Sequence, residues 1–158
     1  MLHLIPAPLH RLALRVGSRL MRHWRRIVRP QLVGASVIVQ DPDGPILMVR
    51  HSYGEEAWLF PGGGCKRGEA PADCARREIR EELGCAIESL ELIGRLDETI
   101  SGAPHAAFVF HARLAGPVRP DGREILEARY FPLDALPEPL GPAVVRRIAL
   151  LQGYSSDS

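Results

Sequence analysis

The sequence predicts an α/β fold: a three-layer α/β/α sandwich around a mixed β-sheet, with an added N-terminal amphipathic helix. Two observations carry this prediction. Apolar, β-rich runs occur before and after a single acidic helical segment, and a second helical segment follows the last run. Of the 158 residues, 46% are apolar, which suffices for the core of one domain. We expect a main domain at residues 31–152, preceded by the helix of residues 1–30 and followed by a polar tail at residues 153–158.

The first segment, residues 1–30, contains no acidic residue and predicts an amphipathic helix from about Pro8 to Arg29. Its apolar runs are too short to span a membrane. The apolar stripe packs on the domain or on a second subunit, or else the helix contacts anionic lipid or RNA; packing is the commoner use. A transit peptide has a similar composition. The arginines of the polar face are Arg11, Arg15, Arg19, Arg22, Arg25, Arg26 and Arg29.

The next segments read as strands joined by turns. Residues 32–40 are β-rich, Asp41–Gly44 is a turn and Pro45–Arg50 is a return strand, which together predict a hairpin that feeds the sheet. Residues 57–60 predict a short strand that delivers a glycine loop, Gly62–Gly64.

The second half of the domain continues in the same way. Residues 87–100 and 105–114 predict two strands joined by a turn, and a short strand is expected around residues 128–131. A final helix is expected at Pro142–Gln152. Its packing positions are Val145, Ile148, Ala149 and Gln152.

The acidic helical segment starts near Pro71, which suits a first helical turn, and Gly84 suits its C-terminal cap. Glu78, Glu81 and Glu82 have the spacing that places three carboxylates on one helical face. The expected packing face consists of Ala72, Ala75, Ile79 and Leu83.

Three carboxylates on one face repel each other, so this cluster needs a compensating positive charge. One source is the interleaved arginines, as in an i,i+4 pair of Arg77 with Glu81, which would make an ordinary solvated face. The other is a hard divalent cation such as Mg²⁺, held together with substrate phosphates. The preceding glycines favour the cation, because glycine lets the backbone approach a phosphate or offer a carbonyl to a metal.

From Gly63 to Cys85 the chain resembles the Nudix box, G-x5-E-x7-R-E-U-x-E-E-x-G-U, in which U is aliphatic. The matching fixed positions are Gly63, Glu69, Arg77, Glu78, Ile79, Glu81, Glu82 and Gly84. Only Cys85 departs, in the final aliphatic slot. The resemblance implies a Nudix-type α/β/α sandwich and a hydrolase that cuts nucleoside diphosphates linked to another group X.

The resemblance also implies a site for metal-assisted attack of water on a phosphoanhydride, with Mg²⁺ as cofactor and Mn²⁺ as the alternative. Arg77 would fix the carboxylates, and Glu78 would be a metal ligand or the general base. A further carboxylate often comes from a later loop, for which Glu124 is preferred and Glu127 held in reserve. The implied catalytic set is Arg77, Glu78, Glu81 and Glu82. The implied metal set is Gly62 (through its carbonyl), Glu69, Glu78, Glu81, Glu82 and Glu124.

Three residues are candidates for substrate binding: Arg50 for a phosphate, Trp58 for stacking on a base, and Glu127. Each has an ordinary alternative, since Trp58 lies in an apolar run typical of a core and Glu127 is typical of an exposed surface. The histidines His51, His105 and His111 could contact a phosphate or base, but they read as ordinary polar positions, because no partner spacing supports a ligand role.

The box does not select a substrate. ADP-ribose or a nucleotide sugar is favoured, with nucleoside triphosphates or dinucleoside polyphosphates as alternatives. An RNA 5′ end is a third class, in which the arginine-rich helix would supply electrostatic contact. A non-catalytic nucleotide sensor is the remaining alternative, and the intact glutamates argue against it.

The three cysteines, Cys65, Cys74 and Cys85, are odd in number and lack zinc-finger spacing. They predict free thiols and a reducing, cytoplasmic location. A homodimer is a further expectation, favoured if the N-terminal helix exposes its apolar stripe.

Overall fold

The structure, a computed structural model, describes residues 13, 16–17, 32–53, 56–120 and 122–156. The predicted N-terminal helix lies outside the described residues, apart from Ala13, Val16 and Gly17, and stays a prediction. The same holds for the lipid, RNA and subunit contacts that depend on it. Among the described residues, no helix has the length and apolarity needed to cross a membrane.

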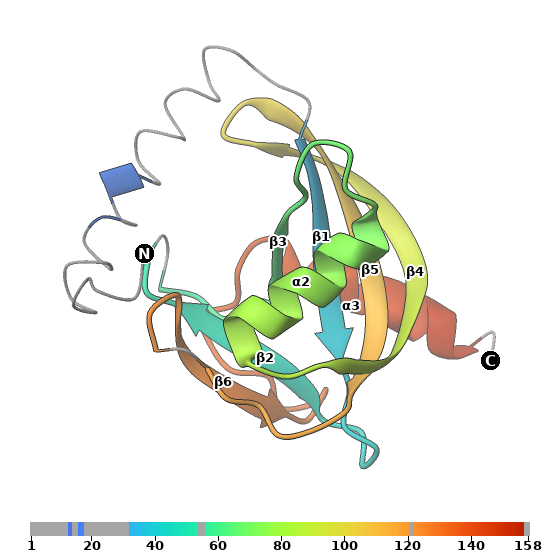
Figure 1. The fold of residues 1–158 in the computed structure, drawn as a ribbon. Coiled ribbons are helices and arrows are strands. Elements are labelled where there is room, and N and C mark those ends of the chain that lie inside the picture. The colour runs from blue at the N-terminus through green and yellow to red at the C-terminus, as the bar shows by residue number, and fades with distance from the viewer. Residues whose placement is uncertain (1–12, 14–15, 18–31, 54–55, 121, 157–158) are drawn as a thin grey trace.

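A four-stranded mixed sheet forms the middle layer, as predicted. Its strand order is β3 (Gly62–Gly64), β1 (Leu32–Val39), β5 (Ala103–Leu114) and β4 (Ile87–Ile100). Strands β1 and β5 are parallel, and the other neighbours are antiparallel. Figure 1 shows α2 (Pro71–Leu83) across one face of this sheet and α3 (Val144–Ser156) behind the other. Helix α3 thus continues beyond the predicted end at Gln152.

The core has two parts because side chains alternate across β1. Val37 and Val39 pack in a cluster with Ile79 of α2, whereas Ile38 packs in a cluster with Leu151 of α3. These side chains are all buried. Burial of an aliphatic side chain of this kind contributes about 1.5–3 kcal/mol, so both helices are held by the same central strand.

The predicted hairpin is wrong in its pairing. Strand β2 (Ile46–His51) pairs antiparallel with β6 (Ile125–Phe131) in a separate two-stranded sheet, seen below α2 in Figure 1. Among the described residues, a single isolated bridge, between Gln40 just after β1 and Ile46 of β2, connects the two segments beyond the turn. The physical reason is that β2 contributes side chains to both parts of the core. Leu47 and Val49 pack in the cluster that contains Ile79 of α2. Ile46 and Met48 pack in the cluster that contains Leu151 of α3, so β2 is buried on both of its faces.

The expected short strand at residues 57–60 also differs from the prediction. Trp58 and Leu59 make only single bridges, to Leu140 and Val49. The paired strand is the glycine run itself, β3, which lies antiparallel to β1 with Ser36 opposite Gly62. A predicted loop is therefore an edge strand.

Helix α2 has the predicted ends, and both helices differ in part from their predicted packing faces. Pro71 lies in the first turn of α2, and Gly84 caps it in the left-handed conformation with φ 63°. On α2, Cys74 is buried and Ala72 is exposed. On α3, Val144 is buried, whereas Val145 is 64% exposed. Ala149 and Gln152 are also exposed, which leaves Ile148 as the correctly predicted packing position.

Candidate metal and nucleotide site

The glycine strand approaches β1 too closely for any side chain at its start. Gly62 has φ 133°, and a Cβ built there would lie 2.2 Å from the backbone oxygen of Ala35. At Gly63 a Cβ would lie 2.6–2.8 Å from the carboxylate atoms of Glu78. The glycines therefore allow α2 to pack directly on the backbone of β3.

Arg77 is the centre of a carboxylate cluster, formed by Glu69 in the loop before α2 and by Glu78, Glu81 and Glu82 of α2. Its Nε donates to Glu69 Oε1 at 2.8 Å and its Nη2 donates to Glu69 Oε2 at 2.9 Å. Its Nη1 donates to Glu78 Oε1 at 2.6 Å and to Glu81 Oε2 at 3.2 Å. Nη2 also donates to the carbonyl of Gly64 at 3.1 Å. One guanidinium thus joins three box glutamates to the glycine strand.

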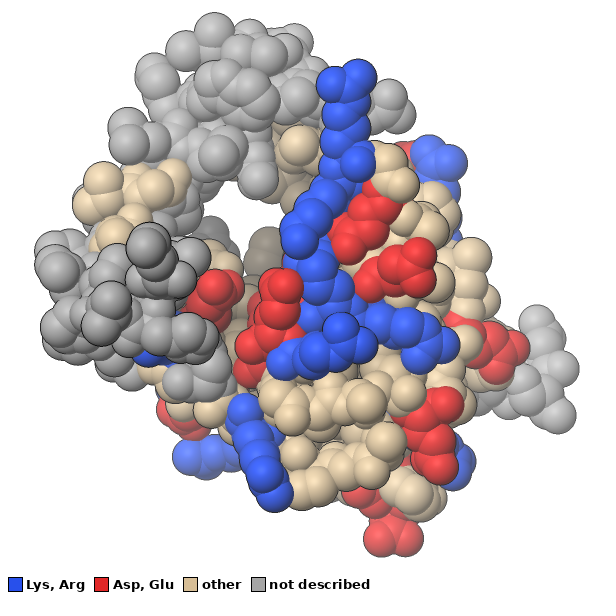
Figure 2. All heavy atoms as spheres, in the orientation of Figure 1, with Lys and Arg blue, Asp and Glu red and all other residues tan. Residues whose placement is uncertain are grey.

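Glu82 is tied to the same strand from the other side. It is 3% exposed, and its Oε2 accepts a hydrogen bond from Gly62 N at 3.0 Å. Glu81 is the most accessible carboxylate of the group, with a side chain 58% exposed. Figure 2 shows the acidic and basic side chains interleaved over α2 and the loop before it.

The cluster perturbs the titration of its members. The pKa of Glu69 is lowered to about 2, because Arg77 and the Lys66 N–H donate hydrogen bonds to its carboxylate. Burial raises the pKa of Glu78, and the hydrogen bond and charge of Arg77 oppose that rise. The pKa of Arg77 is raised, mainly by its hydrogen bonds to Glu69. Arg77 is consequently a permanent cation in this site.

The donor chemistry of the cluster fits a hard divalent cation. Glu78, Glu81 and Glu82 offer carboxylate oxygens from successive turns of one helix, beside a backbone that a side chain would obstruct. Oxygen ligands of this kind suit Mg²⁺ and Mn²⁺. The predicted pairing of Arg77 with Glu81 is present as well.

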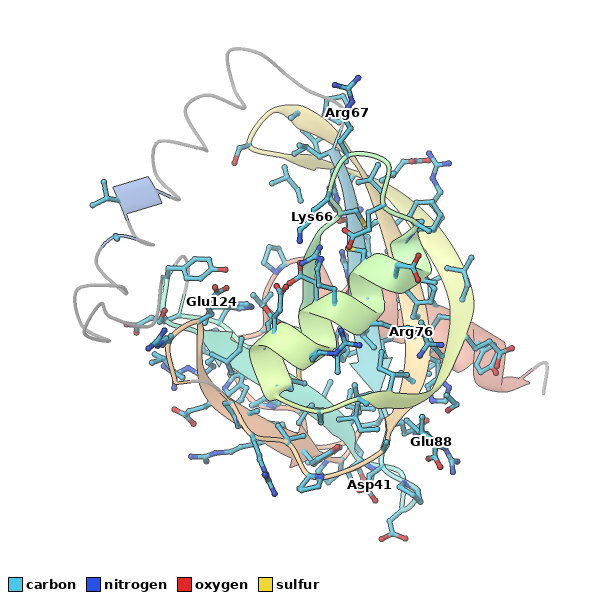
Figure 3. All side chains as sticks on the ribbon, viewed as in Figure 1. Asp41, Lys66, Arg67, Arg76, Glu88 and Glu124 are labelled. Atoms are coloured by element: carbon cyan, nitrogen blue, oxygen red, sulfur yellow. The ribbon has the colours of Figure 1, made fainter. Side chains whose placement is uncertain are left out.

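A cavity of about 750 Å³ adjoins the glycine strand. Its lining includes all three residues of β3 and the loop from Cys65 to Glu69, so it shares Glu69 with the carboxylate cluster. Lys66 and Arg67 bring positive charge to it, and Figure 3 shows both in the loop before α2. Such a volume is within the usual range for a small-molecule site.

The far wall of the cavity carries an ion-pair network that the sequence did not reveal. Glu98 has a side chain only 4% exposed, and Arg147 donates to its two oxygens at 3.0 and 3.1 Å. Arg146 also pairs with Glu98 at 2.8 Å, and His105 lies 3.6 Å from it. Both Arg147 and His105 line the cavity. The sequence pattern does not single out Glu98, because its arginine partners lie on α3, far along the chain.

The predicted substrate-binding residues form a second group on the β2–β6 sheet. Arg50 lies directly opposite Glu127 and pairs with it at 3.0 Å. Trp58 is 6% exposed, packs edge-on against Phe131 and lies under the Arg50 guanidinium. A ring so buried has little surface for a base, so Trp58 belongs to the core, as its alternative reading suggested.

Glu124 immediately precedes β6, next to Ile125, which packs in the same cluster as Ile79 and Leu83 of α2. Figure 3 shows Glu124 at this end of the β2–β6 pair. Its backbone oxygen accepts a hydrogen bond from Ser52 N at 2.8 Å. The position is compatible with a further oxygen ligand from the β6 side, and that role stays a prediction.

The comparisons agree with this geometry. Residues 30–151 match the model of the NUDIX domain family, and the chain belongs to that family. The MutT NUDIX hydrolase from Burkholderia pseudomallei has a solved structure that superposes with a TM-score of 0.69 at 32% identity, covering 78% of this chain and 98% of that one.

Two of the relatives whose names include a substrate match over more than half of this chain. The putative ADP-ribose pyrophosphatase YjhB of Bacillus subtilis is 33% identical over 105 residues, 63% of this chain and 50% of the relative. The NAD-capped RNA hydrolase NudC of Pseudomonas aeruginosa is 39% identical over 107 residues, 59% of this chain and 37% of the relative. The matched region is therefore half or less of each relative's length.

Proposed function

We propose that this protein hydrolyses a phosphoanhydride bond in a nucleotide-type substrate with the help of a divalent cation. The observation that carries the proposal is the Arg77-centred carboxylate cluster, packed on a glycine strand that also lines the cavity. A solvated acidic face would not require the backbone contact between Gly63 and Glu78.

In this proposal Glu78, Glu81 and Glu82 hold Mg²⁺ or Mn²⁺, with the Gly62 carbonyl and Glu124 as further oxygen ligands. The bound cation supplies charge neutralisation of the phosphates and lowers the pKa of a coordinated water. Arg77 holds the carboxylates in register. Glu69 in turn fixes Arg77 through two hydrogen bonds, so it acts as a positioning residue.

For the substrate we propose a nucleoside diphosphate linked to a group X, with ADP-ribose or a nucleotide sugar first. The cavity has the size for a nucleotide portion, and Lys66 and Arg67 add positive charge near the phosphates. The name of the Bacillus subtilis relative includes ADP-ribose.

A second candidate is an RNA 5′ end, favoured by the name of the Pseudomonas aeruginosa relative and by the acid-free, arginine-rich residues 1–30. Salt separates the two candidates. Cleavage of RNA that depends on several arginine–phosphate contacts should weaken steeply between low and moderate salt, whereas cleavage of a small nucleotide should change little.

The test is a substrate panel of ADP-ribose, nucleotide sugars, dinucleoside polyphosphates, nucleoside triphosphates and 5′-capped or triphosphorylated RNA, each with Mg²⁺ and with Mn²⁺. Glu81→Gln removes the negative charge of an accessible candidate ligand and should lower turnover by about two orders of magnitude or more. Glu88→Gln is the matched control, because Glu88 is an exposed glutamate on β4 (Figure 3) outside the cluster.

Metal-dependent turnover of one class, lost in Glu81→Gln and kept in Glu88→Gln, supports the proposal and names the substrate. Tight nucleotide binding without turnover of any member would refute hydrolysis and favour a sensor. Equal activity of the two variants would remove Glu81 from the metal site.

A further inference from the structure

A second set of metal-ligating side chains adjoins the carboxylate cluster and shares Glu69 with it. Cys65 follows the glycine strand, and Cys74 lies in the first turns of α2. Both cysteines are free thiols. The Sγ atoms of Cys65 and Cys74 and one carboxylate oxygen of Glu69 all lie within 4.8 Å of one another. Two sulfurs and one carboxylate oxygen therefore form one compact group.

We propose that Cys65, Cys74 and Glu69 form a binding site for a thiophilic divalent cation of the Zn²⁺ class, separate in chemistry from the oxygen site for Mg²⁺. Sulfur ligands select zinc-like cations, while carboxylates and carbonyls suit magnesium. A tetrahedral zinc with two thiolates and one carboxylate places its ligand atoms about 3.5–3.8 Å apart. The ligand atoms of Cys65, Glu69 and Cys74 would have to approach one another by only about 1 Å to reach these separations.

The site is open on one side and closed on the other. Cys65 and Glu69 line the cavity, which gives the cation a route from solvent. Cys74 is fully buried and forms the base of the site, where its Sγ also lies 3.8 Å from the Gly63 carbonyl. Each thiol releases its proton to solvent as it binds, and three protein ligands leave a fourth position open to water.

Occupation of this site would act on the carboxylate cluster through Glu69. Both oxygens of Glu69 accept from Arg77, and Arg77 Nη2 lies 3.7 Å from Cys74 Sγ. A cation here competes with the guanidinium for Glu69 and repels it. Arg77 keeps Glu78 and Glu81 as partners, so the displacement is local. We therefore expect the thiophilic cation to inhibit, a consequence that rests on the proposed function.

The direct test is titration of the reduced full-length protein with Co²⁺, which reports thiolate coordination by a charge-transfer band in the near ultraviolet. The expected result is a band that saturates at one Co²⁺ per chain, persists in excess Mg²⁺ and is displaced by Zn²⁺. Cys65→Ser and Cys74→Ser should each weaken Co²⁺ binding by at least about tenfold. Cys85→Ser is the matched control, because this third free cysteine lies outside the group.

Circular dichroism of each variant checks folding. Cys74 is buried, so Cys74→Ser is the variant more prone to unfold. If it unfolds, the comparison of Cys65→Ser with the unmodified protein decides the test. Absence of the band in the unmodified protein, or a band unchanged in Cys65→Ser, overturns the proposal.

Zn²⁺ inhibition of Mg²⁺-dependent turnover is measured separately and should be relieved in Cys65→Ser. The absorbance result stands without any hydrolysis, so failure of the metal site and failure of the proposed function are distinguishable.

Discussion

The three neighbouring glycines of β3 are expected to respond differently to alanine, although the sequence makes them look equivalent. At Gly64, a Cβ meets nothing within 4 Å. At Gly63, it meets the carboxylate of Glu78. At Gly62, it meets the backbone oxygen of Ala35, and φ is 133°. The added methyl group therefore meets open space at Gly64, a side chain that can move at Gly63, and a backbone that cannot move at Gly62.

The magnitudes follow from what each methyl group displaces. Gly63→Ala must move Glu78 away from Arg77 and lose a charge-assisted hydrogen bond, which is worth about 1.5–3 kcal/mol. A loss of about 2 kcal/mol in the free energy of unfolding lowers the melting temperature of a chain of this length by roughly 4–8 °C. Gly64→Ala should be neutral or stabilise by up to about 1 kcal/mol, because it restricts the unfolded chain. Gly62→Ala combines backbone strain with overpacking and should destabilise by about 3 kcal/mol or more.

The assay is urea unfolding of all three variants together with turnover of the best substrate. Gly63→Ala should fold and lose about a hundredfold in rate, since a 1 Å displacement of a positioned group has this effect. Gly64→Ala should keep its rate. Equal stability and equal rate of Gly63→Ala and Gly64→Ala would refute the packing of Glu78 on the glycine strand.

Further predictions concern the cavity wall and the metal. Arg147→Met leaves the buried Glu98 with only the exposed Arg146 and His105 beside it and should destabilise by about 3 kcal/mol. The exposed Arg146→Met should cost at most about 1 kcal/mol, with both variants measured by urea unfolding. Burial raises the pKa of Glu98, but the hydrogen bonds and charge of Arg147 outweigh it, so the pKa is lowered. The free energy of unfolding should therefore fall as the pH drops below the ordinary glutamate pKa of about 4.3. This fall should be smaller in Arg147→Met. Chelation of divalent metal should stop turnover but leave the protein folded by circular dichroism, because Arg77 already offsets the carboxylate charge. Mg²⁺ at a hundred times its Kd should then add about 2.7 kcal/mol to the free energy of unfolding.

Local signals in the sequence predicted those parts of the fold that depend on local chemistry. Pro71 and Gly84 mark the ends of α2 because ring geometry and the left-handed cap are properties of single residues. The spacing of Glu78, Glu81 and Glu82 placed the carboxylates correctly on one helix. Arg77 was expected to fix them, and its hydrogen bonds to Glu69, Glu78 and Glu81 are compatible with that role.

The errors arose where the partner is distant in the chain. Strand β2 was assigned to the preceding strand, but it pairs with β6 through contacts such as Arg50 with Glu127. On α3, apolar residues occupy adjacent positions, so Val144 and Val145 fit the helical period equally well. The burial of Arg147 against Glu98 decides between them, and that pair joins two elements.

The alternation along β1 has a consequence for the dynamics of the candidate site. Because successive residues of this strand belong to opposite halves of the core, a slip by one position would direct every apolar side chain to the wrong helix. Neither α2 nor α3 can detach without exposing part of the same strand. We therefore expect the backbone amides of α2 to exchange with solvent only on global unfolding, so the site would stay pre-organised throughout the lifetime of the folded domain.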